Sequence, residues 1–360
     1  MKSKRSGIIS LLIVTLTIAV VLFAVIQSND MRQVVSALRS MNPVWLALGI
    51  LCYAGYIWSE SAGLWFFLRG YGYRLSLPSA AHLSFCGLFY SNLTPGATGG
   101  QPMQIYRMSQ RGIPVGTGTS ALVVRFFFNQ LCWSVMCAVL FLFNRAFCAG
   151  QMGGVAFWIV LGWVINTAGV LLVLAAAFRR EWLEKLGAAL IRWLTKKHWQ
   201  AKRETWTERF HQTMDQYEEP IRDLVGNPRQ IILQLVTSLL ETLFLALVPL
   251  TVYGALGLSG TPWYRLLTVS YLVFVSASYT PLPGASGAQE GGFMLYYRNL
   301  FPDSVISAAL LTWRFITFYL SLILGALDTL WVHLRKSPGK FALHRHRKKE
   351  SGLPDTDGEA

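Results

Sequence analysis

Apolar stretches separated by short polar or basic links run along most of the chain. The stretches span residues 7–26, 43–67, 77–93, 117–143, 155–178, 231–253, 264–279 and 305–332. About 20 helical residues are needed to cross a hydrocarbon core roughly 30 Å thick, because a helix rises about 1.5 Å per residue. The third and seventh stretches are shorter than this and end close to a Pro-Gly pair. The pattern predicts an all-α polytopic membrane protein with about six full transmembrane helices and two re-entrant broken-helix hairpins, about eight apolar segments in all.

The sequence around the Pro-Gly pair occurs twice. Residues 94–101 read TPGATGGQ, and residues 282–289 read LPGASGAQ with Glu290 next. An arginine within an apolar stretch follows each copy: Arg125 lies 30 residues after the first proline, and Arg314 lies 31 residues after the second. The matched order and spacing indicate that two parts of the chain are repeats of each other.

Pro95 and Pro283 are expected to break their helices, since proline lacks a backbone donor and the neighbouring glycines relax the backbone. Within a bilayer, such a break is tolerated only where the backbone is buried in protein or lines a wet cavity. We therefore expect a functional site at the two breaks. The alternative is an ordinary loop between two helices that both cross the membrane.

The charged links divide the chain into two membrane repeats. The expected parts are a first repeat at 1–178, a basic amphipathic cytoplasmic connector at 179–230, a second repeat at 231–334, and a basic then acidic cytoplasmic tail at 335–360. Lysine and arginine favour the cytoplasmic side, which places the connector and both termini there. The two hairpins then open to opposite sides, as in the inverted repeats of transporters. We expect a multi-pass protein of the bacterial inner membrane.

Hydrophobic residues make up 53% of the 360 and charged residues 14%, which excludes an ordinary soluble domain. The formal net charge is +14, but the basic residues gather in the links, where they would face anionic lipid. No direct nucleic-acid partner is therefore expected. The sequence has no P-loop, HExxH or nucleophile-elbow motif, and its five cysteines lack paired metal spacing. We expect no catalytic residue, no cofactor and no metal site.

The breaks have the chemistry of an anion site. Glycine-rich turns expose backbone N–H groups, and a helix that begins after the turn adds its positive dipole end. An arginine can hold a phosphate through two hydrogen bonds. The expected phosphate-binding residues are Arg125, Arg314, Gly96, Gly99, Gly100, Gly284 and Gly287. The expected headgroup or polar-cavity residues are Gln101, Asn129, Gln289, Glu290, Glu241 and Glu60. For either arginine the alternative is a structural ion pair.

At these residues the sequence resembles the lysylphosphatidylglycerol synthase transmembrane family, the flippase-like part of the MprF-type multiple peptide resistance factors and their stand-alone relatives. The first pattern of that family, Thr-Pro-Gly-Gly-x-Gly-Gly-Glu-Pro, is matched by Thr94, Pro95, Gly96, Gly99, Gly100 and Pro102. The second, Pro-x-Pro-Gly-Gly-x-Gly-x-x-Glu, is matched by Pro281, Pro283, Gly284, Gly287 and Glu290. The chain departs from the patterns at Ala97, Gln101 and Ala285.

The resemblance implies that the chain handles phosphatidylglycerol or lysylphosphatidylglycerol, moves it across the bilayer and contributes to resistance to cationic peptides. The partner implied is membrane phospholipid; a separate aminoacyltransferase as partner and an oligomeric state of the chain are left open. A phosphatidylglycerol lysyltransferase activity, or a subunit of that enzyme, is an alternative. However, the chain ends within about thirty residues of the last stretch, so we expect a member without the aminoacyltransferase domain. A transporter of an isoprenoid-linked or other lipid is a second alternative.

Overall fold

The computed structural model describes residues 31–151, 156–178, 222–277, 283–285 and 287–334, together with a few isolated positions between 181 and 212. The expected apolar stretch at 7–26, most of the connector at 179–230 and the tail at 335–360 lie outside these residues. Within the described part, every regular element is a helix, so the all-α prediction is confirmed there.

The elements follow one another as short and long helices without a strand in the described ranges. They are α2 (Met31–Ser40), α3 (Pro43–Gly70), α4 (Leu77–Leu93), η1 (Pro95–Ala97), α5 (Gly100–Ser109), α6 (Val115–Phe143), α7 (Arg145–Gln151), α8 (Ala156–Phe178), α11 (Pro228–Ala255), α12 (Trp263–Ala277), η3 (Pro283–Ala285), α13 (Ala288–Tyr297), α14 (Asp303–Arg314), η4 (Phe315–Tyr319) and α15 (Leu320–Leu334). The segment η4 is a single π-helical turn between α14 and α15.

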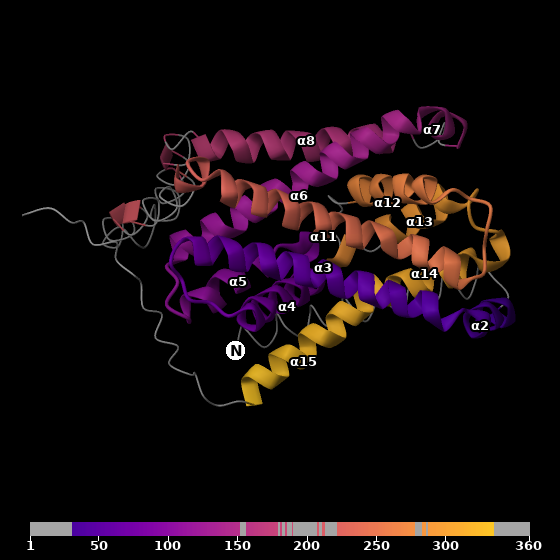
Figure 1. Ribbon diagram of the computed structural model, residues 1–360, viewed down its shortest axis with the longest axis horizontal. Helices are drawn as coiled ribbons and strands as arrows, with labels where there is room; N and C mark the ends of the chain where they lie inside the picture. The colour runs from indigo at the N-terminus through magenta and orange to yellow at the C-terminus, as the bar shows by residue number, and fades with distance from the viewer. Residues whose placement is uncertain are drawn as a thin grey trace, which may run out of the picture.

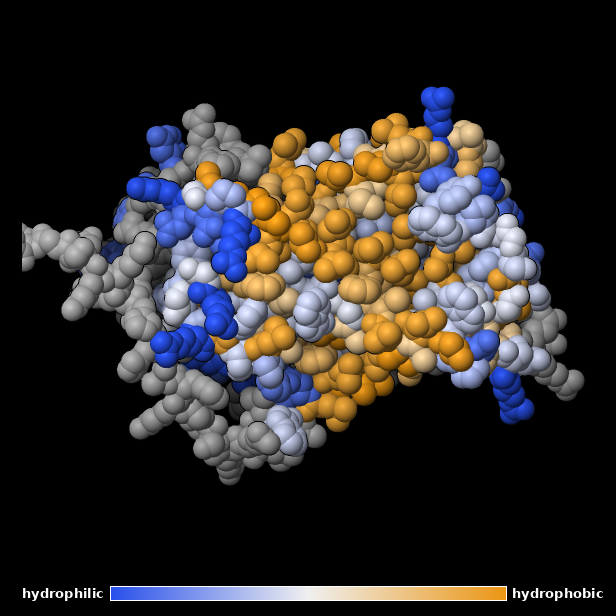
Figure 2. Space-filling view, viewed as in Figure 1, coloured by the Kyte–Doolittle hydropathy of each residue, from blue (hydrophilic) through white to orange (hydrophobic). Residues whose placement is uncertain are grey.

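Three helical segments in the described part are long and apolar enough to cross a membrane: Val115–Phe143, Pro228–Ala255 and Asp303–Thr329. A fourth is added if α2 and α3, which meet at an angle of 88°, count as one bent span. On the face shown in Figure 2, apolar side chains form a broad band across the middle of the molecule, and polar side chains gather toward its two ends. The chain is thus a multi-pass membrane protein. The expected count of about eight apolar segments stays a prediction.

Local sequence signals set where the long helices begin. Asn42 caps α3 by accepting a hydrogen bond from Val44 N at 2.9 Å, and Asn227 caps α11 by accepting one from Gln230 N at 3.2 Å. A proline occupies the first helical position in both cases, where its missing N–H costs nothing. Amide caps of this kind fix where these two 28-residue helices begin.

The order of elements occurs twice. The series α3, α4, η1, α5, α6 is followed after α8 by the series α11, α12, η3, α13 and the segment α14 to α15. Both opening helices have 28 residues, and both α5 and α13 have 10. The helices that close the two series start directly after Pro114 and Pro302. The element pattern is therefore duplicated along with the Pro-Gly sequence.

The opening helices α3 and α11 lie side by side and run in opposite directions (Figure 1). At one end of the pair, Asn42 N donates a hydrogen bond to Ala255 O at 2.8 Å. At the other end, the side-chain Nε2 of Gln230 donates to Phe66 O at 3.2 Å. A large cluster of buried apolar side chains draws on both series of helices. The two series are therefore packed into one body.

Both Pro-Gly turns place an alanine in the left-handed region of backbone space, at φ 56° for Ala97 and φ 50° for Ala285. A side chain in this region costs roughly 1–2 kcal/mol, and glycine avoids that cost. Glycine also loses more conformational freedom on folding, which offsets part of the gain. We expect Ala97→Gly and Ala285→Gly each to raise the free energy of unfolding by about 0.5–1 kcal/mol, which detergent-phase unfolding would measure. Ala54→Gly in α3 is the opposite-signed control, because glycine weakens a helix interior by a similar amount. A loss of stability in either turn variant would contradict this account.

Candidate functional site

The two Pro-Gly turns, far apart in sequence, contact each other in the structure, and residues 95–98 of the first turn are exposed there. The turn η1 contacts η3, and α4 packs against both. Gly96 has φ 60° and ψ 23°, and Gly284 has φ 59° and ψ 23°, so the two turns share one backbone conformation. Between them is a cavity of about 240 Å³, which we name the turn cavity; Gly96, Ala97, Gly284 and Ala285 form part of its wall.

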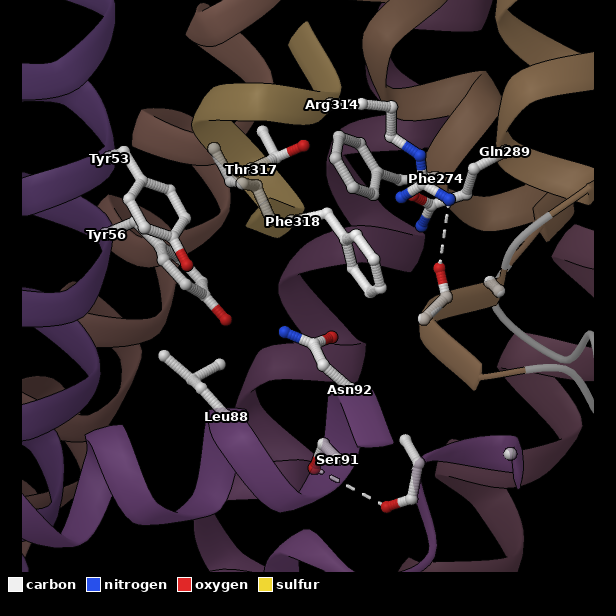
Figure 3. A pocket seen from close by; sticks show the side chains of 15 residues that line it. Tyr53, Tyr56, Leu88, Ser91, Asn92, Phe274, Gln289, Arg314, Thr317 and Phe318 are labelled. Atoms are coloured by element: carbon white, nitrogen blue, oxygen red, sulfur yellow. Dashed lines mark hydrogen bonds between the residues drawn. The ribbon is translucent and has the colours of Figure 1, made fainter. Parts of the chain in front are cut away.

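Side chains from both series of helices complete the wall of the turn cavity. Its lining side chains are Tyr53, Tyr56, Leu88, Ser91, Asn92, Leu245, Phe274, Gln289, Arg314, Thr317 and Phe318. The tyrosines of α3 enter from the side opposite Arg314 and Gln289, and Asn92 of α4 lies between them (Figure 3). Only Arg314 and Gln289 among these side chains are expected from the sequence.

Arg314 joins the end of α14 to the second turn. Its Nε donates to Glu290 Oε1 at 2.6 Å, its Nη1 donates to Gln289 Oε1 at 2.8 Å, and its Nη2 donates to the carbonyl of Gly284 at 3.3 Å. The other carboxylate oxygen of Glu290 accepts the N–H of Gly287 at 2.6 Å, which caps α13. The guanidinium is 2% exposed and forms an ion pair with Glu290. Arg314 therefore holds the turn in shape while one side of it borders the cavity.

A second cavity, of about 170 Å³, lies beside the first turn. We name it the carboxylate cavity because Glu60 of α3 and Glu241 of α11 both line it, together with Arg125, Gln101 and Asn129. Leu88 and Ser91 of α4 line this cavity as well as the turn cavity. The two cavities are therefore separated in part by single side chains of α4.

Arg125 in α6 is paired with a carboxylate on another helix of the chain. Its Nη2 donates to Glu241 Oε2 and forms an ion pair with it, and its Nη1 donates to Thr237 Oγ1 at 3.1 Å. The second oxygen of Glu241 accepts from Asn129 Nδ2 at 2.8 Å. Arg125 is 6% exposed. This network ties the last helix of the first series to the first helix of the second.

The two arginines match in sequence spacing but differ in their partners. Glu290 lies seven residues after Pro283, and the residue seven after Pro95 is Pro102, which has no acid group. The first turn therefore offers no carboxylate to Arg125, and Glu241, 116 residues away, takes that place. Each arginine is thus in an ion pair, the alternative that the sequence left open, and each also borders a cavity.

Three of the predicted glycines serve packing or the turn itself. Gly99 N donates to Thr94 Oγ1 at 2.8 Å, so its amide is already used. A Cβ on Gly100 would lie 1.9 Å from Ser91 Oγ, so this glycine lets α5 approach α4. Gly287 has φ 85° and its amide binds Glu290. Of the described residues, none of these three lines either cavity, whereas Gly96 and Gly284 line the turn cavity.

Most of the predicted site residues line one of the two cavities, whereas Gly99, Gly100, Gly287 and Glu290 line neither. Gly96, Gly284, Gln289 and Arg314 line the turn cavity, and Gln101, Glu60, Asn129, Arg125 and Glu241 line the carboxylate cavity. Tyr53, Tyr56, Asn92 and Thr317 also line the turn cavity and were not expected from the sequence. A signal existed for Asn92, which is a polar residue near the end of an otherwise apolar helix. Within the described ranges, no group of three or more His, Cys, Asp or Glu could hold a metal ion.

Comparison with known proteins gives a match over most of the chain. A family model described as the lysylphosphatidylglycerol synthase TM region matches residues 7–325, which include both turns and both arginines. A protein of Archaeoglobus fulgidus described as a UPF0104 membrane protein is 25% identical over 260 residues, which cover 71% of this chain and 77% of the relative. The resemblance drawn from the turn residues is confirmed. The chain therefore belongs to the lysylphosphatidylglycerol synthase TM region family.

Proposed function

We propose that this protein moves a phospholipid, phosphatidylglycerol or its lysyl form, across the bilayer, with the headgroup passing through the turn cavity. The observation that carries the proposal is the meeting of two identically shaped Pro-Gly turns around a cavity that Arg314 borders. Irregular backbone in a membrane protein is expected to line a route for polar groups, because lipid cannot satisfy its amides. The description of the family fits a lipid substrate.

The lining of the turn cavity suits an anionic headgroup. Tyr53 and Tyr56 turn their hydroxyl groups toward the middle of the cavity (Figure 3). Asn92 lines the cavity as well, with one donor of its amide used by Ser321 Oγ, which leaves the other for a ligand. Hydroxyl and amide groups can donate to phosphate oxygens without adding charge. A phosphate that approaches Arg314 competes with Glu290 for the same guanidinium. Binding then exchanges one anion for another at this guanidinium, so Arg314 itself keeps an anionic partner.

The proposal includes an inverted arrangement of the two series. Opening helices that run antiparallel are what an inverted repeat requires, since equivalent helices then enter the membrane from opposite sides. In this arrangement both termini and the connector at 179–230 lie in the cytoplasm of a bacterial cell, and the protein lies in the inner membrane. Export of lysylphosphatidylglycerol would lower the negative charge of the outer leaflet. That change would weaken the attraction of cationic peptides.

Purified protein in liposomes with fluorescent phosphatidylglycerol and lysylphosphatidylglycerol tests this function. The test variant is Arg314→Gln with Glu290→Gln, which removes the cation and its partner together and leaves no unpaired charge. We expect transbilayer movement to fall at least tenfold while the unfolding temperature stays close to that of the parent. Arg298→Gln, an exposed arginine at the end of α13, is the control and should keep full movement. Unchanged movement in the double variant would refute the role of Arg314.

The description of the family also names a synthase, so lipid aminoacylation is the second candidate function. Incubation of the purified chain with lysyl-tRNA and phosphatidylglycerol decides this point: a lysylated lipid product supports the enzyme, and absence of product removes it. Competition by an isoprenoid-linked sugar, without competition by phospholipid, would point instead to a different lipid substrate.

A further inference from the structure

The carboxylate cavity contains more acid groups than basic groups. Glu60 and Glu241 face one guanidinium, that of Arg125. Arg125 and Asn129 together bind both oxygens of Glu241. Glu60 Oε2 is buried and has no hydrogen-bond partner among the described residues. Arg125, the one basic residue among the described residues of the cavity wall, is therefore already paired with Glu241.

A buried carboxylate oxygen without a partner is unfavourable unless a positive charge neutralises it. The cavity of about 170 Å³ has room for several water molecules at roughly 30 Å³ each, so a small cation with part of its water shell fits. Ser91, Gln101 and Gln104 line the same space and offer further oxygen atoms. The site is thus suited to a single small positive charge bound at Glu60.

The surroundings of Glu60 contain few other charges. Arg125 comes from α6 and Glu241 from α11, while α4 and α5 contribute only neutral side chains to the lining. On α3 itself, Tyr56 lies one turn away and lines the neighbouring turn cavity. Since the ion pair of Arg125 and Glu241 is neutral overall, the net charge of the cavity is set by the state of Glu60.

We infer that Glu60 binds the coupling cation, one proton or one Na⁺ ion, whose binding and release accompany lipid movement through the adjacent turn cavity. This inference rests on the proposed function. The cation site and the turn cavity are adjacent, because Leu88 and Ser91 of α4 line both cavities. Filling or emptying the site changes the net charge on one side of that wall, and an anionic headgroup on the other side experiences the change.

Cation binding is first tested without transport, on protein in detergent. At fixed ionic strength, replacement of choline by Na⁺ should raise the unfolding temperature of the parent protein if Na⁺ is the ion. If the ion is a proton, infrared difference spectra between two pH values should show a buried carboxylic acid band. Glu60→Gln should abolish the effect, and Glu60→Asp should retain it in shifted form. Asp303→Asn, an exposed acid at the start of α14, is the matched control and should leave the effect intact.

Transport is then measured in liposomes with an imposed gradient of either pH or Na⁺. We expect one of the two gradients to accelerate lipid movement at least fivefold in the parent and in Asp303→Asn, and not in Glu60→Gln. Lipid movement that depends on Arg314 but responds to neither gradient would overturn the coupling role and leave the proposed function standing. If no lipid moves in any sample, the proposed function fails, and the detergent experiments still decide whether Glu60 binds a cation.

Discussion

Arg125→Ala is expected to lower the free energy of unfolding by about 3–5 kcal/mol, because it leaves a buried carboxylate without its cation. Glu241 would lose its ion pair, and Glu60 already lies in the same cavity with an unpartnered oxygen. Two acid groups would then share a buried space, and no positive side chain would remain among the described residues that line it. Unfolding of detergent-solubilised protein by heat or by denaturing detergent measures the loss.

The control for this prediction removes both members of the ion pair. Arg125→Met combined with Glu241→Leu replaces the pair by apolar side chains of similar volume and should recover most of the lost stability, since such exchanges are often neutral. Arg298→Ala, at an exposed position, should change the free energy of unfolding by less than about 0.5 kcal/mol. A single Arg125→Ala variant as stable as the parent would show that the pair does not form.

Gly63→Ala is expected to be nearly as damaging, although it adds only one methyl group. A Cβ on this glycine of α3 would lie 1.8 Å from Nη1 of Arg125 and 2.8 Å from Oγ1 of Thr237. The guanidinium would have to leave the place where it binds Glu241. We expect a loss of about 3 kcal/mol, similar to that from breaking the ion pair itself. Thermal unfolding again provides the measurement.

A double variant tests this prediction, because the effects of Gly63→Ala and Arg125→Ala on stability should not add. In the Arg125→Ala background the added methyl group has no guanidinium to displace, so the penalty of Gly63→Ala should largely vanish. Gly291→Ala in α13 is the matched control, because a Cβ there meets no atom within 4 Å. Alanine at that helical position should be neutral or stabilise by up to about 1 kcal/mol. Equal penalties for Gly63→Ala with and without Arg125 would contradict the steric account.

Helix boundaries and helix breaks could be predicted from the sequence where the signal for them is local. The predicted stretch at 77–93 is the helix α4 to the residue, because Ser76 caps its start and Pro95 lies just past its end. Both Pro-Gly pairs do form turns that interrupt helices. The inverted orientation of the repeats depends on the membrane around them and stays a prediction.

The partners of the arginines could not be read from the sequence. Four acid groups stand within or beside the apolar stretches, and spacing does not tell which of them Arg125 will meet across 116 residues. The residues that line the cavities could not be predicted either, because the apolar residues of α3 are spread around the whole helix and mark no single face. Tyr53 and Tyr56 therefore look like ordinary members of an apolar span until the fold places the turns beside them.

The antiparallel contact between α3 and α11 has a consequence for cohesion. At about 1.5 Å per residue, a 28-residue helix is about 42 Å long, so the seam between these helices is long enough to cross a hydrocarbon layer roughly 30 Å thick. Tyr53 and Trp133 come from one series and Tyr271 and Trp313 from the other, yet they belong to a single cluster of buried side chains. Side chains packed in one shared cluster thus hold the two series together along this seam.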